Sequence, residues 1–429
     1  MDKVDVIIVG GGLAGLSCAY ELADSGMTVI VLERGDFSGS KNVTGGRIYL
    51  GPIRNLFPDL WKDAPLERHV TKEIFTLMGE TNSTTLELYS ERFNREPYPS
   101  YTILRAKFDR WFADIVSEKG VFVIPQKNVD DLIQEDGKVI GVRAGDEEIG
   151  ADCVVAADGI LSFLAEKASL RQPFKPQHFA LGFKEVIELP PQTIEDRFRL
   201  GDGEGAAQLF VGSLTKGMLG GGFLYTNRES LSLGIVVGIH SLNVREPREE
   251  VYKLLDQFKE RPEVRNLIKG GRIVEYSAHL ISEGGPQVRP KLYTDGMVVT
   301  GDAAGLGLNM LVTVRGMEYA MASGVFAGRA IKRAKERNDF SASSLSYYEQ
   351  LLNESFIMKE MNSFRHSLSI LENRRLFSKY PQAISDLFEK VMRVDELPKE
   401  GLYKTLSREV RKNFLNLQTF KDWLQFRKI

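Results

Sequence analysis

The first 33 residues constrain the fold of this chain more than any other segment. A β-branched apolar run, 4–9, leads directly into Gly10-Gly11-Gly12-Leu13-Ala14-Gly15, which has the G-x-G-x-x-G spacing. Apolar residues then recur at helical spacing to about Asp24, and Gly26 is placed to end that helix. A second apolar strand, 27–32, ends at Glu33. This order predicts a complete βαβ unit that binds a dinucleotide.

Each residue type in the unit has a physical role. The first glycine permits a tight turn, the second lets the backbone approach a pyrophosphate, and the third lets the helix pack closely on the sheet. Unpaired N–H groups at the start of the helix attract phosphate. Glu33 is spaced to accept a hydrogen bond from a ribose hydroxyl and would repel a 2′-phosphate. The residues expected to contact the cofactor here are Gly10, Gly12, Leu13, Ala14, Gly15, Glu33 and Arg34.

Composition excludes several classes of protein. The 429 residues are 43% hydrophobic and 27% charged, as expected for a globular protein of two or three domains. A net charge of −2 argues against nucleic-acid binding. No apolar run reaches the length of a membrane span. Because a strand begins at once, we expect no signal peptide and a cytoplasmic location, either in solution or on the membrane surface that faces the cytoplasm.

Metal sites are not expected. The only cysteines are Cys18 and Cys153, whereas an iron–sulfur cluster usually needs four thiolates and structural zinc needs several Cys or His ligands. The five histidines are scattered, and none has metal-ligand spacing to another. We therefore interpret both cysteines as small buried core residues.

The rest of the chain divides into three regions. Segment 101–117 is predicted to be a helix carrying Arg105, 129–141 a strand-turn-strand with a hairpin at Asp136-Gly137, and 151–157 a buried strand ended by Asp158-Gly159. Ser162 fits a helix N-cap or a turn. The strand-like runs 179–189, 206–211, 221–225 and 231–240, with a helical stretch at 248–267, predict an inserted, mostly antiparallel sheet. A strand at 296–300, a long helix at 315–335 rich in small residues, and helices from 341 follow.

The order of these segments resembles that of the glutathione-reductase-like FAD flavoproteins of the p-hydroxybenzoate-hydroxylase type. The resemblance implies that FAD is the cofactor and that Asp302, after Gly301, binds its ribityl–phosphate part. It implies that the helix after residue 315 points its N-terminus at the flavin, where it would stabilise the anionic reduced ring. By the same resemblance Val129 approaches the adenine. Arg105 contacts the pyrophosphate or forms a surface ion pair, and Asp158 is structural.

Three further segments resemble the electron-transfer-flavoprotein:quinone oxidoreductases, in particular the short FixC type. They are 41–47 (KNVTGGR), 220–225 (GGGFLY) with 231–234 (LSLG), and 309–316. The resemblance implies that electrons pass from the alpha and beta subunits of an electron-transfer flavoprotein to FAD and then to a quinone. Larger members carry cluster-binding cysteines near the C-terminus, and this chain has none there. The FixC type would use a separate small ferredoxin-like [4Fe–4S] protein instead.

The resemblance also implies which residues surround the flavin ring and the quinone. Thr44, Gly45, Gly46, Arg47 and Asn309 would lie near the flavin. The quinone candidates are Gly221, Gly222, Phe223 and Tyr225. The glycine run at 220–222 lets a strand approach a flat ligand, or it marks a bulge or sharp bend. Tyr225 contacts the quinone or is an ordinary half-buried strand tyrosine.

The C-terminal segment 401–429 carries seven Lys or Arg and two acids, a net charge of +5, interleaved with apolar residues that include Trp423. Such a helix lies in a bilayer interface, docks on a partner, or packs on its own core. The three interpretations stay open at this point.

The resulting prediction is an α/β protein. A Rossmann-like FAD-binding domain comprises 1–168 and 291–340, with 48–100 contributing to the substrate side. An inserted, mostly antiparallel α+β quinone domain comprises 169–290, and a helical region comprises 341–429. The expected function is electron transfer from the flavoprotein to a membrane quinone. The rival is a geranylgeranyl-reductase-like enzyme that saturates prenyl double bonds. A monooxygenase and a non-catalytic docking subunit are further alternatives.

Overall fold

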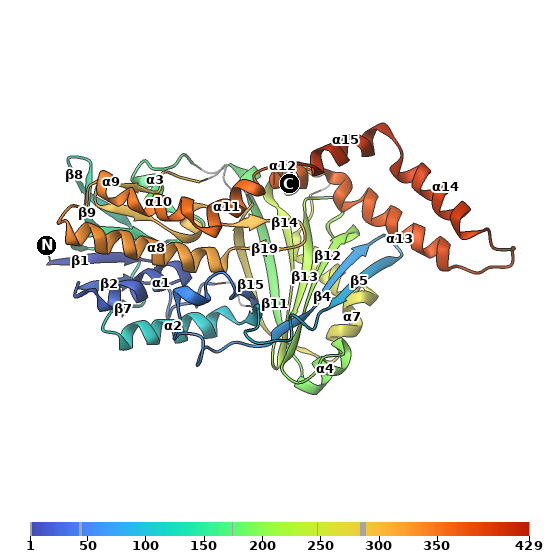
Figure 1. Ribbon diagram of the computed structural model, residues 1–429, viewed down its shortest axis with the longest axis horizontal. Coiled ribbons are helices and arrows are strands. Elements are labelled where there is room, and N and C mark those ends of the chain that lie inside the picture. Colours follow the sequence, from blue (N-terminus) through green and yellow to red (C-terminus); the bar gives the residue numbers. More distant parts are fainter. Residues whose placement is uncertain (1, 43–44, 174, 247, 284–288, 429) are drawn as a thin grey trace.

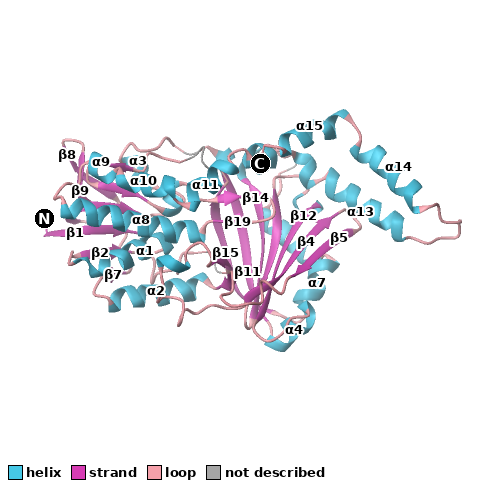
Figure 2. Cartoon of the chain, viewed as in Figure 1, coloured by secondary structure: helices cyan, strands magenta, loops and turns pink. Residues whose placement is uncertain are grey.

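The computed structural model describes residues 2–42, 45–173, 175–246, 248–283 and 289–428. Two large sheets stand side by side along the long axis of the molecule (Figure 1). Helices cover the first sheet, and a helical arm formed by the last part of the chain extends beyond the second (Figure 2). None of the helices among the described residues has the length and hydropathy that a membrane span requires.

The first sheet is parallel at its centre. Within the described residues it has eight strands, with the path β16-β17-β10-β1-β2-β7 and a β8–β9 hairpin attached to β10. β1 pairs in parallel with both β2 and β10. Its strands are β1 (Asp2–Val9), β2 (Val29–Leu32), β7 (Phe122–Ile124), β8 (Asp131–Glu135), β9 (Lys138–Ala144), β10 (Glu147–Ala156), β16 (Tyr293–Thr294) and β17 (Met297–Val299).

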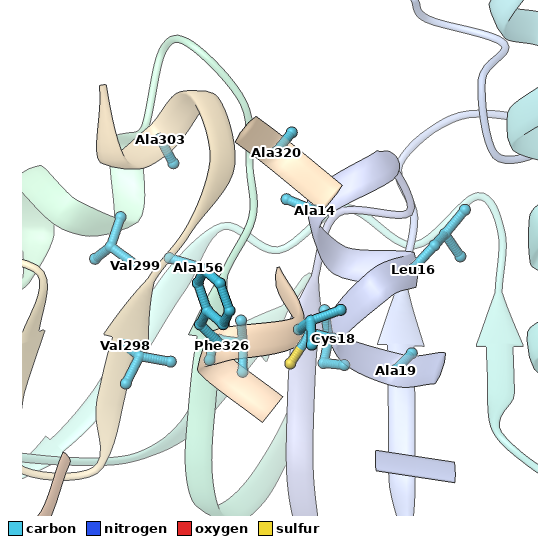
Figure 3. Close-up of a cluster of buried hydrophobic side chains, with 14 of the residues drawn as sticks. Ala14, Leu16, Cys18, Ala19, Ala156, Val298, Val299, Ala303, Ala320 and Phe326 are labelled. Atoms are coloured by element: carbon cyan, nitrogen blue, oxygen red, sulfur yellow. The ribbon is translucent and has the colours of Figure 1, made fainter. Parts of the chain in front are cut away.

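Small residues bring two helices into close contact on this sheet. α1 (Leu13–Leu22) crosses α8 (Met317–Glu336), and a Cβ on Gly324 would lie 2.1 Å from the Ala14 carbonyl oxygen. Figure 3 shows Ala14, Cys18 and Ala320 among the buried side chains of this region. The small residues of the long helix therefore allow α8 to pack closely against α1. α2 (Arg105–Glu118) and α3 (Phe163–Lys167) also belong to this part of the chain.

The second sheet combines strands from two separate stretches of sequence. Within the described residues it has nine strands, with the path β15-β11-β14-β13-β12-β4-β6-β3 and β5 paired to β4. Most pairs are antiparallel, but β12 joins β4 in parallel. Its strands are β3 (Gly46–Tyr49), β4 (His69–Met78), β5 (Ser83–Tyr89), β6 (Ser100–Ile103), β11 (Phe179–Glu188), β12 (Glu204–Gly212), β13 (Gly220–Thr226), β14 (Ser230–Gly238) and β15 (Arg272–Ser282).

A separate apolar core lies under the second sheet. It includes Phe210, Leu233 and Phe258, which are buried. The helices of this region are α4 (Pro191–Phe198), α5 (Ile239–Asn243), α6 (Val251–Glu260) and α7 (Pro262–Ile268).

The final third of the chain is helical apart from its first strands. A short β18–β19 hairpin (Leu308–Asn309 and Val314–Arg315) precedes α8. The subsequent helices are α9 (Ala342–Leu345), α10 (Tyr347–Glu354), α11 (Phe356–Ser363), α12 (Ser367–Leu371), α13 (Lys379–Met392), α14 (Leu402–Phe414) and α15 (Leu417–Phe426). Figure 1 shows α14 projecting away from both sheets.

The predicted α/β architecture is confirmed, with three corrections to local structure. Segment 100–103 is a strand, and the helix begins only at Arg105, because Tyr101 and its neighbours pair with β3. The strand predicted to reach residue 240 ends at Gly238, where α5 begins. Pro262 starts a new helix within the stretch 248–267. Ser162 is the N-cap residue of α3, one of the two predicted possibilities, although its hydroxyl donates to the Ala303 carbonyl oxygen and makes no cap hydrogen bond.

Candidate functional site

A cavity of about 910 Å³ lies between the two sheets and reaches the C-terminal helices. Its walls include the turn after β1, the segment around residues 39–49, the strands of the second sheet, the β18–β19 hairpin, and α13 to α15. The predicted site residues that line it are Gly10, Gly12, Leu13, Ala14, Glu33, Arg34, Gly45, Gly46, Arg47, Arg105, Val129, Asp158, Gly221, Gly222, Phe223, Tyr225, Asp302 and Asn309.

Three predicted residues are not in this lining. Gly15 lies behind the turn, where a Cβ would be 2.0 Å from the Gly10 carbonyl oxygen. Gly301 faces Ala14, and a Cβ there would be 2.6 Å from the Ala14 Cβ. These two glycines permit close packing around the site. Thr44 lies outside the described residues.

The turn after β1 has the form that a dinucleotide requires. Gly10 has a φ of +108°, and a Cβ on it would lie 2.2 Å from the Ala157 carbonyl oxygen. A Cβ on Gly12 would meet no atom within 4 Å among the described residues, so the backbone there borders open space. Gly12 is also the N-cap of α1 and makes no side-chain cap hydrogen bond. The first N–H groups of α1 are therefore available to an anion.

Glu33 closes the far side of this turn. Its carboxylate accepts hydrogen bonds from the Gly11 N–H at 2.8 Å and the Gly35 N–H at 2.6 Å, and the side chain is buried. These two bonds fix the carboxylate at the cavity wall. Their geometry leaves it acceptor capacity toward the cavity, which is compatible with the expected ribose contact.

Arg105 and Asp302 place opposite charges near the middle of the cavity. Arg105 donates two hydrogen bonds to Asp109, at 2.8 and 2.7 Å, and Asp109 is fully buried. Burial opposes the charge on Arg105, but Asp109 raises its pKa above the usual value. Protein surrounds Asp302, whose carboxyl still has solvent access through the cavity, and burial raises its pKa. Arg105 forms an ion pair with a buried carboxylate and also lines the cavity, and its contact with the pyrophosphate stays a prediction.

The two carboxylate oxygens of Asp158 have different surroundings. One carboxylate oxygen accepts from the Leu164 N–H at 3.1 Å, which caps α3. The other oxygen is buried and has no hydrogen-bond partner among the described residues. Burial raises the pKa of Asp158 to about 6. A buried acceptor without a partner fits a site completed by a bound polar ligand.

The wall formed by β13 is aromatic. The rings of Phe223 and Tyr225 stack with centroids 5.3 Å apart, and both line the cavity. The glycine run before them is explained by internal packing: a Cβ on Gly220 would lie 2.0 Å from the Val236 carbonyl oxygen, and one on Gly222 would lie 2.6 Å from Phe258. Close contacts within the protein therefore account for Gly220 and Gly222. The approach of this strand to a flat ligand stays a prediction.

The structure adds cavity residues that the predicted set omitted. Lys184 on β11 and Glu283 line the cavity, and burial lowers the pKa of Lys184 and raises that of Glu283, both to about 7. Asn309 donates to Glu283 at 3.2 Å. Tyr49 also lines the cavity, with the Arg47 guanidinium 4.5 Å from its ring centroid. The sequence signal that could have identified Lys184 as a site residue is its charge within an otherwise mostly apolar strand.

The C-terminal helices close one end of the cavity. Tyr380 and Ile384 of α13 contribute to the wall, as do Trp423 and Phe426 of α15. Asp422 of α15 is held by Arg375 and Tyr380. This end of the cavity is therefore apolar and depends on how α15 is docked.

Comparisons with known proteins agree with this geometry. Residues 5–97 match a model of FAD dependent oxidoreductases, 179–281 match the ubiquinone-binding model of ETF-QO, and 368–429 match the C-terminal domain of the ETF-QO/FixC family. A probable electron transfer flavoprotein-quinone oxidoreductase, YdiS of Escherichia coli K12, is 42% identical over 96% of this chain and 95% of its own length. Protein FixC of the same strain is 42% identical over 97% of both chains.

The chain belongs to the ETF-QO/FixC family. As a member of that family it is an FAD-dependent oxidoreductase of the dehydrogenase type, which confirms the predicted family and cofactor. Solved structures share the fold at lower identity. A geranylgeranyl bacteriochlorophyll reductase-like protein of Thermoplasma acidophilum superposes with a TM-score of 0.73 at 21% identity, covering 98% of this chain and 99% of that one. The myxobacterial halogenase CndH superposes at 0.65 and 18% identity over 97% of both chains.

Proposed function

We propose that this ETF-QO/FixC family member accepts electrons from an electron-transfer flavoprotein and passes them to a membrane quinone. The observation that carries the proposal is the single cavity that joins the dinucleotide turn at Gly10–Ala14 to an aromatic wall and an apolar end at α15. A polar cofactor and a lipophilic acceptor would meet there without crossing solvent. FAD supplies the redox chemistry when bound, and the protein sets its position and surroundings.

The cofactor would lie along the first half of the cavity. The open backbone at Gly12 and the start of α1 suit its diphosphate, and Glu33 suits a ribose hydroxyl. Asp302 would accept from the ribityl–phosphate part. The reactive ring would then face Gly45–Gly46 and the start of α8. On the same basis we propose that residues 1–168 and 291–340 form the FAD-binding domain and that residues 169–290 form the quinone-binding domain.

The quinone would occupy the aromatic half of the cavity. Phe223 and Tyr225 offer flat surfaces, and quinone reduction requires a hydrogen-bond donor near each carbonyl oxygen. Burial and the neighbouring Tyr49 raise the pKa of Tyr225, so its hydroxyl stays protonated and can donate. The segment that matches the ubiquinone-binding model, 179–281, and the segment that matches the C-terminal domain of the family, 368–429, both contribute to the walls of this half.

The C-terminal arm supports a location at the membrane surface. Packing on its own core does not account for this segment, because most of its large apolar side chains are exposed. A net charge of +5 on residues 401–429 suits an anionic lipid surface. We therefore assign the arm to peripheral binding at the cytoplasmic face. The exposed apolar residues are Phe388, Met392, Val394, Leu397, Leu402, Tyr403, Val410, Leu415, Leu417, Phe420, Trp423 and Leu424.

The partners would include both flavoprotein subunits and a small ferredoxin-like [4Fe–4S] protein. Cys18 and Cys153 are both buried, in separate elements, α1 and β10. Among the described residues no group of three or more His, Cys, Asp or Glu is placed to hold a metal. A cluster in the electron path would therefore come from another subunit.

The test uses the FAD-loaded chain with reduced electron-transfer flavoprotein and a short-chain ubiquinone analogue, with and without the ferredoxin-like subunit. Loss of quinone absorbance at a rate that depends on this chain supports the proposal. Reducing the bound FAD with a stoichiometric amount of dithionite before the quinone is added takes the place of the flavoprotein and separates a wrong donor from a wrong acceptor. If FAD becomes reduced but the quinone does not, the acceptor assignment is wrong, and prenyl-lipid analysis then tests the geranylgeranyl-reductase alternative.

A further inference from the structure

Lys184 is a half-buried cation that the proposed electron path does not yet use. It lies in the middle of β11 and lines the cavity. Its Nζ donates a hydrogen bond to the Gly45 carbonyl oxygen and lies 5.1 Å from the centroid of the Phe223 ring. The side chain thus joins the second sheet to the segment that precedes β3.

The segment that Lys184 contacts has little freedom to move. Gly45 has a φ of +82°, and a Cβ on it would lie 2.0 Å from the Ser232 Oγ. A Cβ on the next residue, Gly46, would lie 3.1 Å from the Met317 Cε at the start of α8. Lys184 therefore fastens a stretch of backbone that is already enclosed by the sheet and by α8.

The charges around Lys184 do not neutralise it. Arg105, a second cation, is already paired with Asp109. Among the described residues no ion pair joins Lys184 to a carboxylate, and Glu275 acts on it only at longer range. Burial, followed by Arg105, lowers its pKa to about 7. His279, which also borders the cavity, has its own pKa lowered by burial. Placing an ammonium group in a partly buried position without an acidic partner costs free energy, unless a bound ligand offers it negative charge.

We propose that Lys184 positions the Gly45 segment against FAD and supplies a positive charge at the edge of the flavin ring. Two-electron reduction adds two electrons and one proton to the ring and leaves one negative charge there. That charge favours the protonated form of Lys184, so a neutral Lys184 takes up a second proton from solvent when the ring is reduced. The inference rests on the FAD position proposed above, but not on the identity of the electron donor or of the quinone.

The experiment is an anaerobic titration of the FAD-loaded protein with dithionite, which uses neither a protein donor nor a quinone. It compares wild type with Lys184→Met, which removes the charge, and Lys184→Arg, which keeps a charge that does not titrate. FAD content, the ratio of reduced to oxidised FAD at a fixed potential, and protons taken up per two electrons are measured at pH 6 and pH 8.

Wild type is expected to take up about one proton at pH 6 and about two at pH 8, because Lys184 is largely neutral before reduction only at the higher pH. Lys184→Arg should take up about one at both. In Lys184→Met the ratio of reduced to oxidised FAD should fall by about 10- to 100-fold, the effect of a unit charge a few ångströms away in a partly buried site. Wild-type values in Lys184→Met would overturn the proposal. If Lys184→Met retains no FAD, identical proton uptake by wild type and Lys184→Arg at pH 8 overturns it.

Discussion

The docking of α15 depends on one buried carboxylate, and its removal gives the sharpest structural prediction. The Asp422 side chain is 3% exposed and accepts hydrogen bonds from Arg375, through Nε at 2.7 Å and through Nη2, and from the Tyr380 hydroxyl. The hydrogen bond from Arg375 is the main cause that lowers the pKa of Asp422 to about 2. From the usual value near 3.8, this shift corresponds to about 2 kcal/mol, and Arg375 is one-third exposed, so solvent reduces the figure to about 1–2 kcal/mol.

Asp422→Asn should therefore make the opening of α15 easier by about 1–2 kcal/mol, which is about 5- to 30-fold faster amide hydrogen exchange across residues 417–426. Asp395→Asn is the matched control, because Asp395 forms an ion pair in which both side chains are about half exposed or more, and it should leave this exchange unchanged. Unaltered exchange of α15 in Asp422→Asn would show that apolar contacts alone dock the helix.

The same carboxylate gives a pH dependence with a defined sign. A lowered folded-state pKa adds stability that is complete above the unfolded pKa, near 3.8, and that disappears as the pH falls toward 2. Trp423, which borders the cavity on α15, reports this change by fluorescence. Wild type should lose the docked signal between about pH 4 and pH 2, and Asp422→Asn should show no transition assigned to this group.

Three further predictions address packing, the quinone and the membrane. Gly324→Ala forces α1 and α8 apart, at a cost of about 1–3 kcal/mol, and should lower the FAD content on purification. Gly51→Ala should leave the FAD content unchanged, because a Cβ at that position meets nothing within 4 Å. Tyr225→Phe should raise the KM for the quinone analogue by about 5- to 20-fold without slowing FAD reduction, and the exposed Tyr276→Phe is the control. Leu417→Ser with Phe420→Ser should reduce sedimentation with vesicles containing anionic lipid, while Ile273→Ser with Val274→Ser on β15, two apolar side chains that are also exposed, should not. Equal behaviour of a variant and its control would count against the corresponding assignment.

Local patterns predicted the nucleotide-binding half of the molecule well. The turn from Gly10 to Gly15, the helix after it and the stop at Gly26, which has a φ of +72°, follow from short-range backbone requirements. The hairpin at Asp136-Gly137 is likewise set by two residues. Each of these features is specified within a few neighbouring positions, so a single sequence is sufficient to recognise it.

The second sheet was harder to predict because its strands come from distant segments. Residues 100–103 form a strand that pairs with β3 and β4, and the aromatic and β-branched side chains of 101–103 also favour a strand. The parallel contact between β4 and β12 joins residues more than a hundred positions apart. Pairing over such distances leaves no signal in a local pattern, whereas the helix start predicted four residues too early, at 101, disregards strand-favouring residues in the segment itself.

The candidate site shows the same limit at the level of single side chains. Glu33 was found because its distance along the chain from Gly15 is characteristic of a nucleotide-binding unit. Lys184 carries no such spacing: its contact with the Gly45 carbonyl spans 139 positions and exists only because β11 runs past the segment before β3. Arg105 approaches Lys184 from a third element, α2. Charged residues that meet from separate elements have no characteristic spacing along the chain. Motif spacing therefore does not detect residues such as Lys184, which the fold brings next to Arg105.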